Sequence, residues 1–179
     1  QILILKNHLT RIAKHALYLI ICLSIWSFKS KGNQQSAVFE IQTKNDSMVC
    51  DSLFCFAKQY IDKPYCYGSK TPKCFDCSGL VRHVFSHFGV ELPHCSDCQG
   101  KLGKFVSPKN AMRGDLIFFN GRQKNSETVG HVGIVSHVEG EKIFFIHASV
   151  QAGVIISNSE ELYYRERFMF VKRIPIQNN

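Results

Sequence analysis

The sequence of 179 residues contains no low-complexity tract and no internal repeat, and 45% apolar against 20% charged residues is the composition of a globular protein. It also lacks a basic stripe interleaved with aromatic side chains. Of the net charge of +8, +5 lies in residues 1–32, which contain no acidic residue. The other residues carry 17 basic and 14 acidic side chains, an ordinary surface charge of +3. We therefore expect one globular domain and no nucleic-acid partner.

The first residues of the chain have the pattern of a targeting segment. Three basic residues, Lys6, Arg11 and Lys14, precede an apolar run over residues 16–28. This run of 13 residues is shorter than the ~20 that span a bilayer, but it suits the apolar part of a secretory signal. The segment is therefore interpreted as an export signal.

This interpretation divides the chain into three parts. We expect a signal peptide or an uncleaved N-terminal anchor over residues 1–32, a polar linker over residues 33–46 and a catalytic domain over residues 47–176. The domain would then act outside the cytoplasm: in the periplasm, associated with the cell envelope, or as a secreted protein. Only the N-terminal segment would contact a membrane.

Apolar residues at a helical spacing predict two helices in the first half of the domain. One covers residues 47–61, and the other begins at Cys77 and ends at Gly89. Residues 92–110 are expected to form a loop and a short helix. The second half changes to runs of β-forming residues separated by turn residues, at positions 115–119, 131–138, 142–147, 154–156 and 168–171. Helices followed by strands predict an α+β fold, with N-terminal helices packed on a five- to six-stranded antiparallel sheet.

A cysteine stands at the first turn of the second predicted helix. The positive end of the helix dipole and the free N–H groups there are expected to stabilise the Cys77 thiolate, a nucleophile. His131 begins one predicted strand and His147 ends the next, so a hairpin can bring both imidazoles to the start of the helix. A thiol nucleophile needs a base, and the base needs a group that orients it. We interpret Cys77 as the nucleophile, His131 as the base and His147 as the orienting residue.

Three segments around these residues resemble the NlpC/P60 family of papain-like cell-wall peptidases. FDCSGLV at residues 75–81 resembles the nucleophile motif of the family, GHVGI at residues 130–134 its catalytic-histidine motif, and IHAS at residues 146–149 the segment of its third polar residue. Shorter matches lie at residues 64–65, 92–93, 113–119 and 164–168. The resemblance covers about residues 48–174, in the order and spacing of the family.

The resemblance implies a papain-like fold and an exported cysteine endopeptidase. Its partners would be peptidoglycan peptides, in which it would hydrolyse an amide bond of a stem or cross-link peptide, typically between D-glutamate and a diamino acid, through a thioester. No metal or other cofactor follows from the resemblance, and we expect a monomer. The resemblance carries over Cys77, His131 and His147 as the catalytic triad. The implied substrate-binding residues are Tyr65, Asp76, Ser78, His94 and Ser96.

Several cysteines depart from the pattern of the family. The sequence has Cys95 within a His-Cys-Ser run where Arg-Thr-Ser is common, and the other additional cysteines, Cys66, Cys74 and Cys98, also flank the expected cleft. Without residues 1–32, seven cysteines remain. An odd number fits one free catalytic thiol and up to three disulfides in an oxidising compartment, although the sequence does not assign the pairs.

Two other functions fit parts of the sequence. Cys74 and Cys77 are separated by 17 residues from Cys95 and Cys98, a spacing found in four-cysteine zinc modules, which would make the protein a zinc-stabilised binding module. The residues between the two pairs, however, have the pattern of an amphipathic helix. A related thiol amidase or acyltransferase acting on a substrate outside the cell wall would keep the same triad.

Overall fold

The computed structural model describes residues 40, 48–69, 71–121, 123–124 and 126–176. The chain divides into two units, residues 1–45 and residues 46–179. The predicted signal or anchor lies outside the described residues, as does the predicted linker apart from Glu40, which is helical. Within the described segments, no helix is both long and apolar enough to span a membrane.

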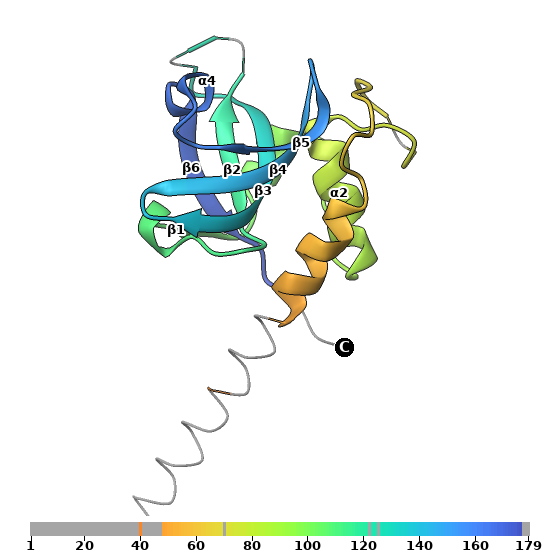
Figure 1. Cartoon of the computed structure of the whole chain (residues 1–179), viewed down its shortest axis with the longest axis horizontal. Helices are drawn as coiled ribbons and strands as arrows, with labels where there is room; N and C mark the ends of the chain where they lie inside the picture. Colours follow the sequence, from red (N-terminus) through yellow and green to blue (C-terminus); the bar gives the residue numbers. More distant parts are fainter. Residues whose placement is uncertain (1–39, 41–47, 70, 122, 125, 177–179) are drawn as a thin grey trace, which may run out of the picture. The chain divides into compact units, whose positions relative to one another are not determined.

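A six-stranded antiparallel sheet forms the second half of the domain (Figure 1). The strand order is β1-β6-β2-β3-β4-β5, and every neighbouring pair is antiparallel. This confirms the predicted α+β fold with an antiparallel sheet. The strands are β1 (Lys104–Val106), β2 (Leu116–Asn120), β3 (Val129–Glu139), β4 (Lys142–Ser149), β5 (Gly153–Asn158) and β6 (Phe168–Arg173).

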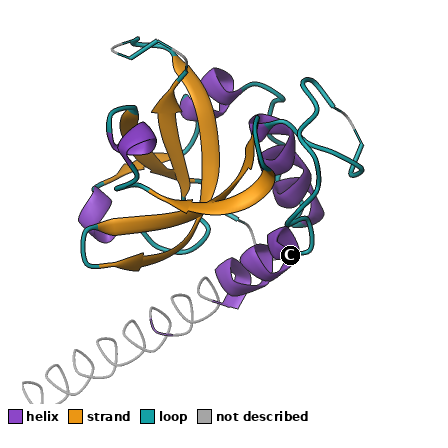
Figure 2. Cartoon of the chain, turned by 45° about the horizontal axis from the view of Figure 1, so that its top comes forward, coloured by secondary structure: helices purple, strands orange, loops and turns teal. Residues whose placement is uncertain are grey.

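Helices lie mainly before the sheet in the chain, and Figure 2 shows the first helix and α2 on the same side of the sheet. Residues 48–58 are helical, within the range that the sequence predicts. The other helices are α2 (Cys77–His87), α3 (Ser96–Gly100), the 3-10 helix η1 (Pro108–Asn110) and α4 (Leu162–Arg165). The short helix expected within residues 92–110 is α3, but the segment also forms β1 and η1, which were not expected. That strand has three residues and a largely exposed Phe105, so its pairing with β6, not a local pattern, creates it.

The start and end of α2 follow from local chemistry. Asp76 is the N-cap, and its side-chain Oδ1 accepts a hydrogen bond from the Gly79 N–H at 2.6 Å. After the helix, Gly89 has a φ of 75°, a conformation that favours glycine and ends the helix. The apolar side of α2, including Leu80 and Val84, is fully buried against the sheet. Cys77 is thereby fixed at a rigid helix terminus.

Both faces of the central strands are buried. Along β2, Leu116 and Phe118 face the core under the helices, whereas Ile117 and Phe119 face a second core that contains Tyr164 of α4. Burial on both sides explains why β2 is a continuous apolar run without alternation. The face of the sheet that packs against this second core is also the face that carries His131 and His147.

Gly133 of β3 is a position where the sheet has no room for a side chain. A Cβ atom there would lie 2.6 Å from Cδ2 of Phe145 and 3.0 Å from the carbonyl oxygen of Ile146. We expect Gly133→Ala to lower the free energy of unfolding by about 2 kcal/mol, because a buried ring and a backbone strand must both move. Urea unfolding followed by circular dichroism measures this change.

Gly121→Ala is the matched control. A Cβ atom at Gly121 meets only the Cα atom of Gly130, at 3.4 Å, which is an ordinary contact. This variant should therefore remain within about 0.5 kcal/mol of the wild type, as surface substitutions usually do. Equal stability of the Gly133 and Gly121 variants would contradict the packing described for β3.

Candidate active site

The thiol of Cys77 lies between the start of α2 and strand β3. Backbone N–H groups of Cys77, Ser78 and Val132 form hydrogen bonds to the thiol that lower its pKa. Burial and the negative charge of Asp76 act more strongly in the other direction and raise the pKa of Cys77 to about 11. The expected stabilisation of the thiolate by the helix terminus is present in these hydrogen bonds, but desolvation outweighs it.

The β3–β4 hairpin brings His131 and His147 together, as the pairing of their strands predicts. His131 Nε2 lies 3.0 Å from His147 Nδ1, and the two rings are nearly perpendicular, with centroids 5.0 Å apart. His147 is completely buried. Burial lowers the pKa of His131 to about 4, and burial together with the neighbouring His131 lowers the pKa of His147. Both rings are therefore neutral at neutral pH, and one donates its N–H to the other.

The backbone of Val132 connects Cys77 with the histidine pair. The thiol accepts a hydrogen bond from the N–H of Val132, the residue directly after His131. Within the part of the chain that the structure describes, no hydrogen bond joins the thiol to the His131 ring itself. Because Nε2 of His131 faces His147, Nδ1 is the ring nitrogen that remains for the thiol. Catalytic hydrogen bonds often shorten only when substrate is bound.

The carboxylate of Asp76 connects several of the residues predicted to bind substrate. It accepts hydrogen bonds from the Gly68 N–H at 2.8 Å, the Gly79 N–H at 2.6 Å and Ser78 Oγ at 3.1 Å. His94 Nε2 lies 2.9 Å from both of its oxygens. Since a carboxylate only accepts, His94 must carry a proton on this nitrogen. The structure thus places Asp76, Ser78 and His94 in one buried network at the start of α2.

The other two predicted substrate-binding residues border the same helix terminus. Tyr65 pairs with Phe75 through a parallel β-bridge, and Phe75 directly precedes Asp76 in the chain. Ser96 Oγ donates a hydrogen bond to the carbonyl oxygen of Val129 at 3.4 Å, two residues before His131. All five residues therefore surround the start of α2 and of β3.

Two disulfides close short loops beside these residues. Cys66 pairs with Cys74, and Cys95 pairs with Cys98. Cys77 is a thiol, and two further thiols lie on the first helix, at Cys50 and Cys55. The expected upper limit of three disulfides is not reached, because residues five positions apart on one helix point in different directions.

The disulfides also overturn the alternative of a four-cysteine zinc module. Of its four proposed ligands, Cys74, Cys95 and Cys98 are disulfide-bonded, and only Cys77 is a thiol. Zinc binds thiolates, which these three sulfur atoms cannot provide. Among the described residues, no group of three or more histidine, cysteine or acidic side chains is arranged to hold a metal ion.

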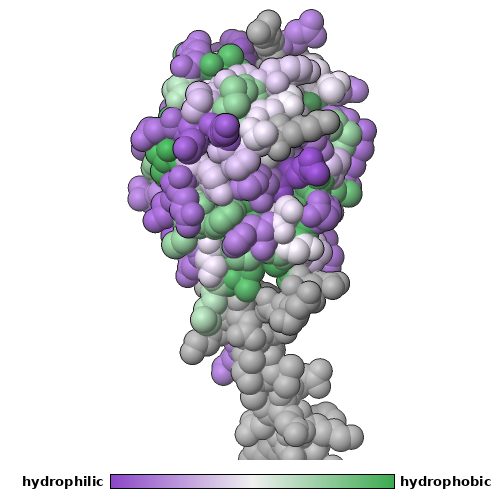
Figure 3. Space-filling view, turned by 90° about the vertical axis from the view of Figure 1, so that its right-hand side faces the viewer, coloured by the Kyte–Doolittle hydropathy of each residue, from purple (hydrophilic) through white to green (hydrophobic). Residues whose placement is uncertain are grey.

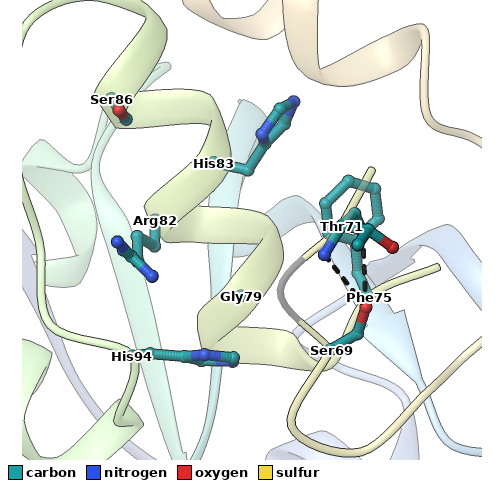
Figure 4. Close-up of a pocket in the computed structure, with 8 residues that line it drawn as sticks. All are labelled: Ser69, Thr71, Phe75, Gly79, Arg82, His83, Ser86 and His94. Carbon is teal, nitrogen blue, oxygen red and sulfur yellow. Dashed lines mark hydrogen bonds between the residues drawn. The ribbon is translucent and has the colours of Figure 1, made fainter. Parts of the chain in front are cut away.

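A small polar pocket lies beside α2, and Cys77 is not among the residues that line it (Figure 4). His94 borders it, so the pocket adjoins the Asp76 network and not the thiol. The surface on this side of the molecule is predominantly hydrophilic, with scattered hydrophobic groups (Figure 3). The lining residues are Ser69, Thr71, Phe75, Gly79, Arg82, His83, Ser86 and His94.

Three buried polar side chains of the site were not predicted as site residues. Gln99 Nε2 donates to the carbonyl oxygens of Ser78 and Pro93 and ties α3 to α2. The hydroxyls of Ser157 and Tyr164 each lie 3.2 Å from His147 Nε2. The alternation of side chains along β5 would have been enough to predict that Ser157 lies on the same face of the sheet as His147. The four-residue helix α4 that carries Tyr164 offers no comparable signal.

Comparison with known proteins agrees with this geometry. The sequence model of the NlpC/P60 family matches residues 62–173. Murein DD-endopeptidase MepS/Murein LD-carboxypeptidase of Escherichia coli (strain K12) is 39% identical over 152 residues, which cover 82% of this chain and 77% of that protein. Gamma-DL-glutamyl hydrolase of Bacillus subtilis (strain 168) is 35% identical over 129 residues, which cover 68% of this chain and 30% of that protein.

The fold is also similar to that of NlpC/P60 family proteins of known structure. The crystal structure of an NlpC/P60 family protein from Bacillus cereus superposes with a TM-score of 0.62 and 26% sequence identity, over 69% of this chain and 39% of that chain. The chain therefore corresponds to well under half of that longer structure. Sequence, fold and the position of the cysteine at a helix terminus lead to one conclusion: the chain belongs to the NlpC/P60 family.

Proposed function

We propose that this protein is an exported cysteine endopeptidase that hydrolyses amide bonds in peptidoglycan stem or cross-link peptides. The observation that carries the proposal is the contact between the half-buried His131 and the buried His147, with 3.0 Å between Nε2 and Nδ1, beside a helix that begins with Cys77. A single buried histidine is often structural, but a coupled pair next to a thiol is suited to acyl transfer. The murein endopeptidase name of the E. coli relative supports peptidoglycan as the substrate.

The reaction begins from a neutral thiol and a neutral imidazole. As the sulfur of Cys77 attacks the amide carbonyl carbon, His131 Nδ1 takes the thiol proton. The backbone N–H of Cys77 donates to the developing oxyanion. Collapse of the tetrahedral intermediate breaks the C–N bond, and His131 gives its proton to the leaving amine. A thioester on Cys77 remains.

Water completes the cycle through the same histidine. His131 Nδ1 removes a proton from the water molecule, whose oxygen attacks the thioester carbonyl. The C–S bond then breaks, the proton passes from His131 to the Cys77 sulfur, and the acid product leaves. His147 holds the His131 ring throughout and accepts its Nε2–H, which stabilises the transient imidazolium.

The residues around Asp76 form the proposed substrate-binding region. Asp76 and Ser78 would contact the amino side of the substrate, and Tyr65 would lie near the oxyanion or the substrate. His94 and Ser96 would supply further substrate contacts. We favour the bond between D-glutamate and a diamino acid, and the name of the B. subtilis relative, Gamma-DL-glutamyl hydrolase, supports hydrolysis of a glutamyl bond. Cleavage of a D,D cross-link is the second candidate, supported by the DD-endopeptidase name of the E. coli relative.

Digestion of purified peptidoglycan followed by mass spectrometry tests this function. The wild type should release stem-peptide fragments, whereas Cys77→Ala and His131→Ala should lose at least about 10³-fold in rate, because each removes an essential participant in acyl transfer. Fragment masses distinguish cleavage after D-glutamate from cleavage of a cross-link. Cys55→Ser, which changes an exposed thiol on the first helix, should retain full activity.

Unchanged fragment release by the Cys77→Ala variant would contradict the proposed nucleophile. Intact peptidoglycan after incubation with folded wild-type protein would contradict the proposed substrate. In that second case the triad would remain available for a thiol amidase or acyltransferase with another acyl substrate.

The pKa of Cys77 gives a separate prediction for the free protein. Thiolates, not thiols, react with iodoacetamide, and a pKa raised to about 11 leaves the thiol protonated at neutral pH. The alkylation rate of Cys77 should therefore rise about tenfold for each pH unit from pH 7 to pH 10, without a plateau. Mass spectrometry of the peptide that carries Cys77 measures this rate separately from the other thiols. A rate that is already constant below pH 8 would show a resting thiolate–imidazolium pair instead.

A further inference from the structure

The far side of His147 is enclosed by two hydroxyl groups. Ser157 Oγ and the Tyr164 hydroxyl each lie 3.2 Å from His147 Nε2, and the two hydroxyls also interact with each other. His147 is 0% exposed, and Ser157 and Tyr164 are 6% and 8% exposed. Within the described residues, these hydroxyls are the only groups that hydrogen-bond to this nitrogen.

The fold builds this arrangement from three elements. Ser157 of β5 lies opposite Phe145 of β4, two residues from the partner of His147, so both side chains point to the same face of the sheet. A short turn then leads into α4, in which Glu161 accepts a hydrogen bond from the Asn158 N–H at 2.8 Å. This turn returns the chain over the histidines and places Tyr164 beside Ser157.

The ring of Tyr164 also packs against both histidines. Its centroid lies 5.3 Å from that of His147, at 74°, and 6.4 Å from that of His131, at only 26°. Phe119 and Phe145 enclose the same ring at 5.2 and 5.0 Å. The hydroxyl is therefore fixed in position by aromatic packing and cannot turn away from His147 Nε2 without disturbing the second core.

Proton positions in the chain of rings are coupled. If His131 Nδ1 is to accept a proton from Cys77, its own proton must be on Nε2, which then donates to His147 Nδ1. His147 must in turn carry its proton on Nε2 and donate it to an acceptor. A buried N–H without an acceptor is unfavourable, so loss of the acceptors would favour the proton on His147 Nδ1. That form would donate to His131 Nε2 and place the His131 proton on Nδ1, where it blocks the base.

We propose that Ser157 and Tyr164 are positioning residues that jointly accept the Nε2–H of His147 and thereby keep His131 Nδ1 free to act as the base. The effect on activity rests on the proposed function, whereas the proton positions do not. Each of the two hydroxyls can accept the hydrogen bond of His147 Nε2–H without the other. The decrease in activity when both hydroxyls are removed should therefore exceed the product of the decreases caused by removing each one.

Nitrogen-15 NMR of the histidine rings tests the proton positions directly. In the wild type, the Nε2 atoms of His131 and His147 should have the shifts of protonated nitrogens, and both Nδ1 atoms those of unprotonated ones. In the Ser157→Ala/Tyr164→Phe double variant the proton should move to Nδ1 in both rings. Spectra of His131→Ala and His147→Ala assign the signals. A wild-type His147 protonated on Nδ1 would overturn the proposal without any measurement of activity.

Peptidoglycan hydrolysis tests the catalytic consequence. Ser157→Ala and Tyr164→Phe should each lower kcat by less than about tenfold, and the double variant by about 10³-fold, with KM changed less than about threefold, because only the base is affected. Ser157→Thr, which keeps a hydroxyl, should restore kcat when combined with Tyr164→Phe. Tyr163→Phe removes the neighbouring, half-exposed hydroxyl and should have no effect.

The outcomes separate the two proposals. If the protons move in the double variant as expected but the wild type does not hydrolyse peptidoglycan, the proposed function fails and the role of the hydroxyls stands. Active protein whose double variant loses no more than the product of the single losses would overturn the joint acceptor. Circular dichroism of every variant establishes that the rates compare folded proteins.

Discussion

The rest of the site depends on the hydrogen bonds that the carboxylate of Asp76 accepts. It caps α2 and so determines where the helix begins and where Cys77 stands. It also accepts hydrogen bonds from Gly68 and His94, which belong to two different loops. A buried carboxylate that is satisfied by several donors is stable in its charged form, while any one missing donor leaves a buried charge partly unpaired. Helix terminus and loops are therefore positioned together, not independently.

The same carboxylate influences the chemistry of the thiol. Its negative charge adds to burial in raising the pKa of Cys77, while burial lowers the pKa of His131. Both shifts favour a thiol and a neutral imidazole over a thiolate–imidazolium pair. Charge would form only during the reaction, when the oxyanion and the imidazolium appear together and compensate one another. In the proposed reaction the proton would be transferred during attack, without a preformed thiolate.

Local patterns in the sequence were sufficient to predict much of this structure. The helical spacing of apolar residues located α2, and the change to β-forming runs located five of the six strands. The position of His131 and His147 in successive strands was enough to predict their contact. Each of these features depends on residues close in sequence or on a single hairpin, where the period of the side chains carries the information.

The features that sequence could not supply depend on contacts between distant segments. β1 exists because of its pairing with β6, and the pKa of Cys77 depends on how deeply the assembled domain buries it. The two hydroxyls at His147 come from β5 and α4, which meet the histidine only after the sheet has formed. Propensity and motif spacing contain no measure of desolvation, so they favoured a thiolate where the folded site favours a thiol.

The additional cysteines and His94 are best understood together. Both disulfides close short loops, over sequence separations of 8 and 3 residues, and short loops restrict the unfolded chain less than long ones. Their main effect is therefore local. The N–H of Gly68, within the loop closed by Cys66 and Cys74, donates to Asp76, and His94, which directly precedes Cys95, contacts both oxygens of the same carboxylate. A histidine reaches less far than an arginine, so a ring that contacts a buried carboxylate needs its backbone held close. The Cys95–Cys98 disulfide provides that constraint at the neighbouring residue, which links two departures from the family pattern to one carboxylate.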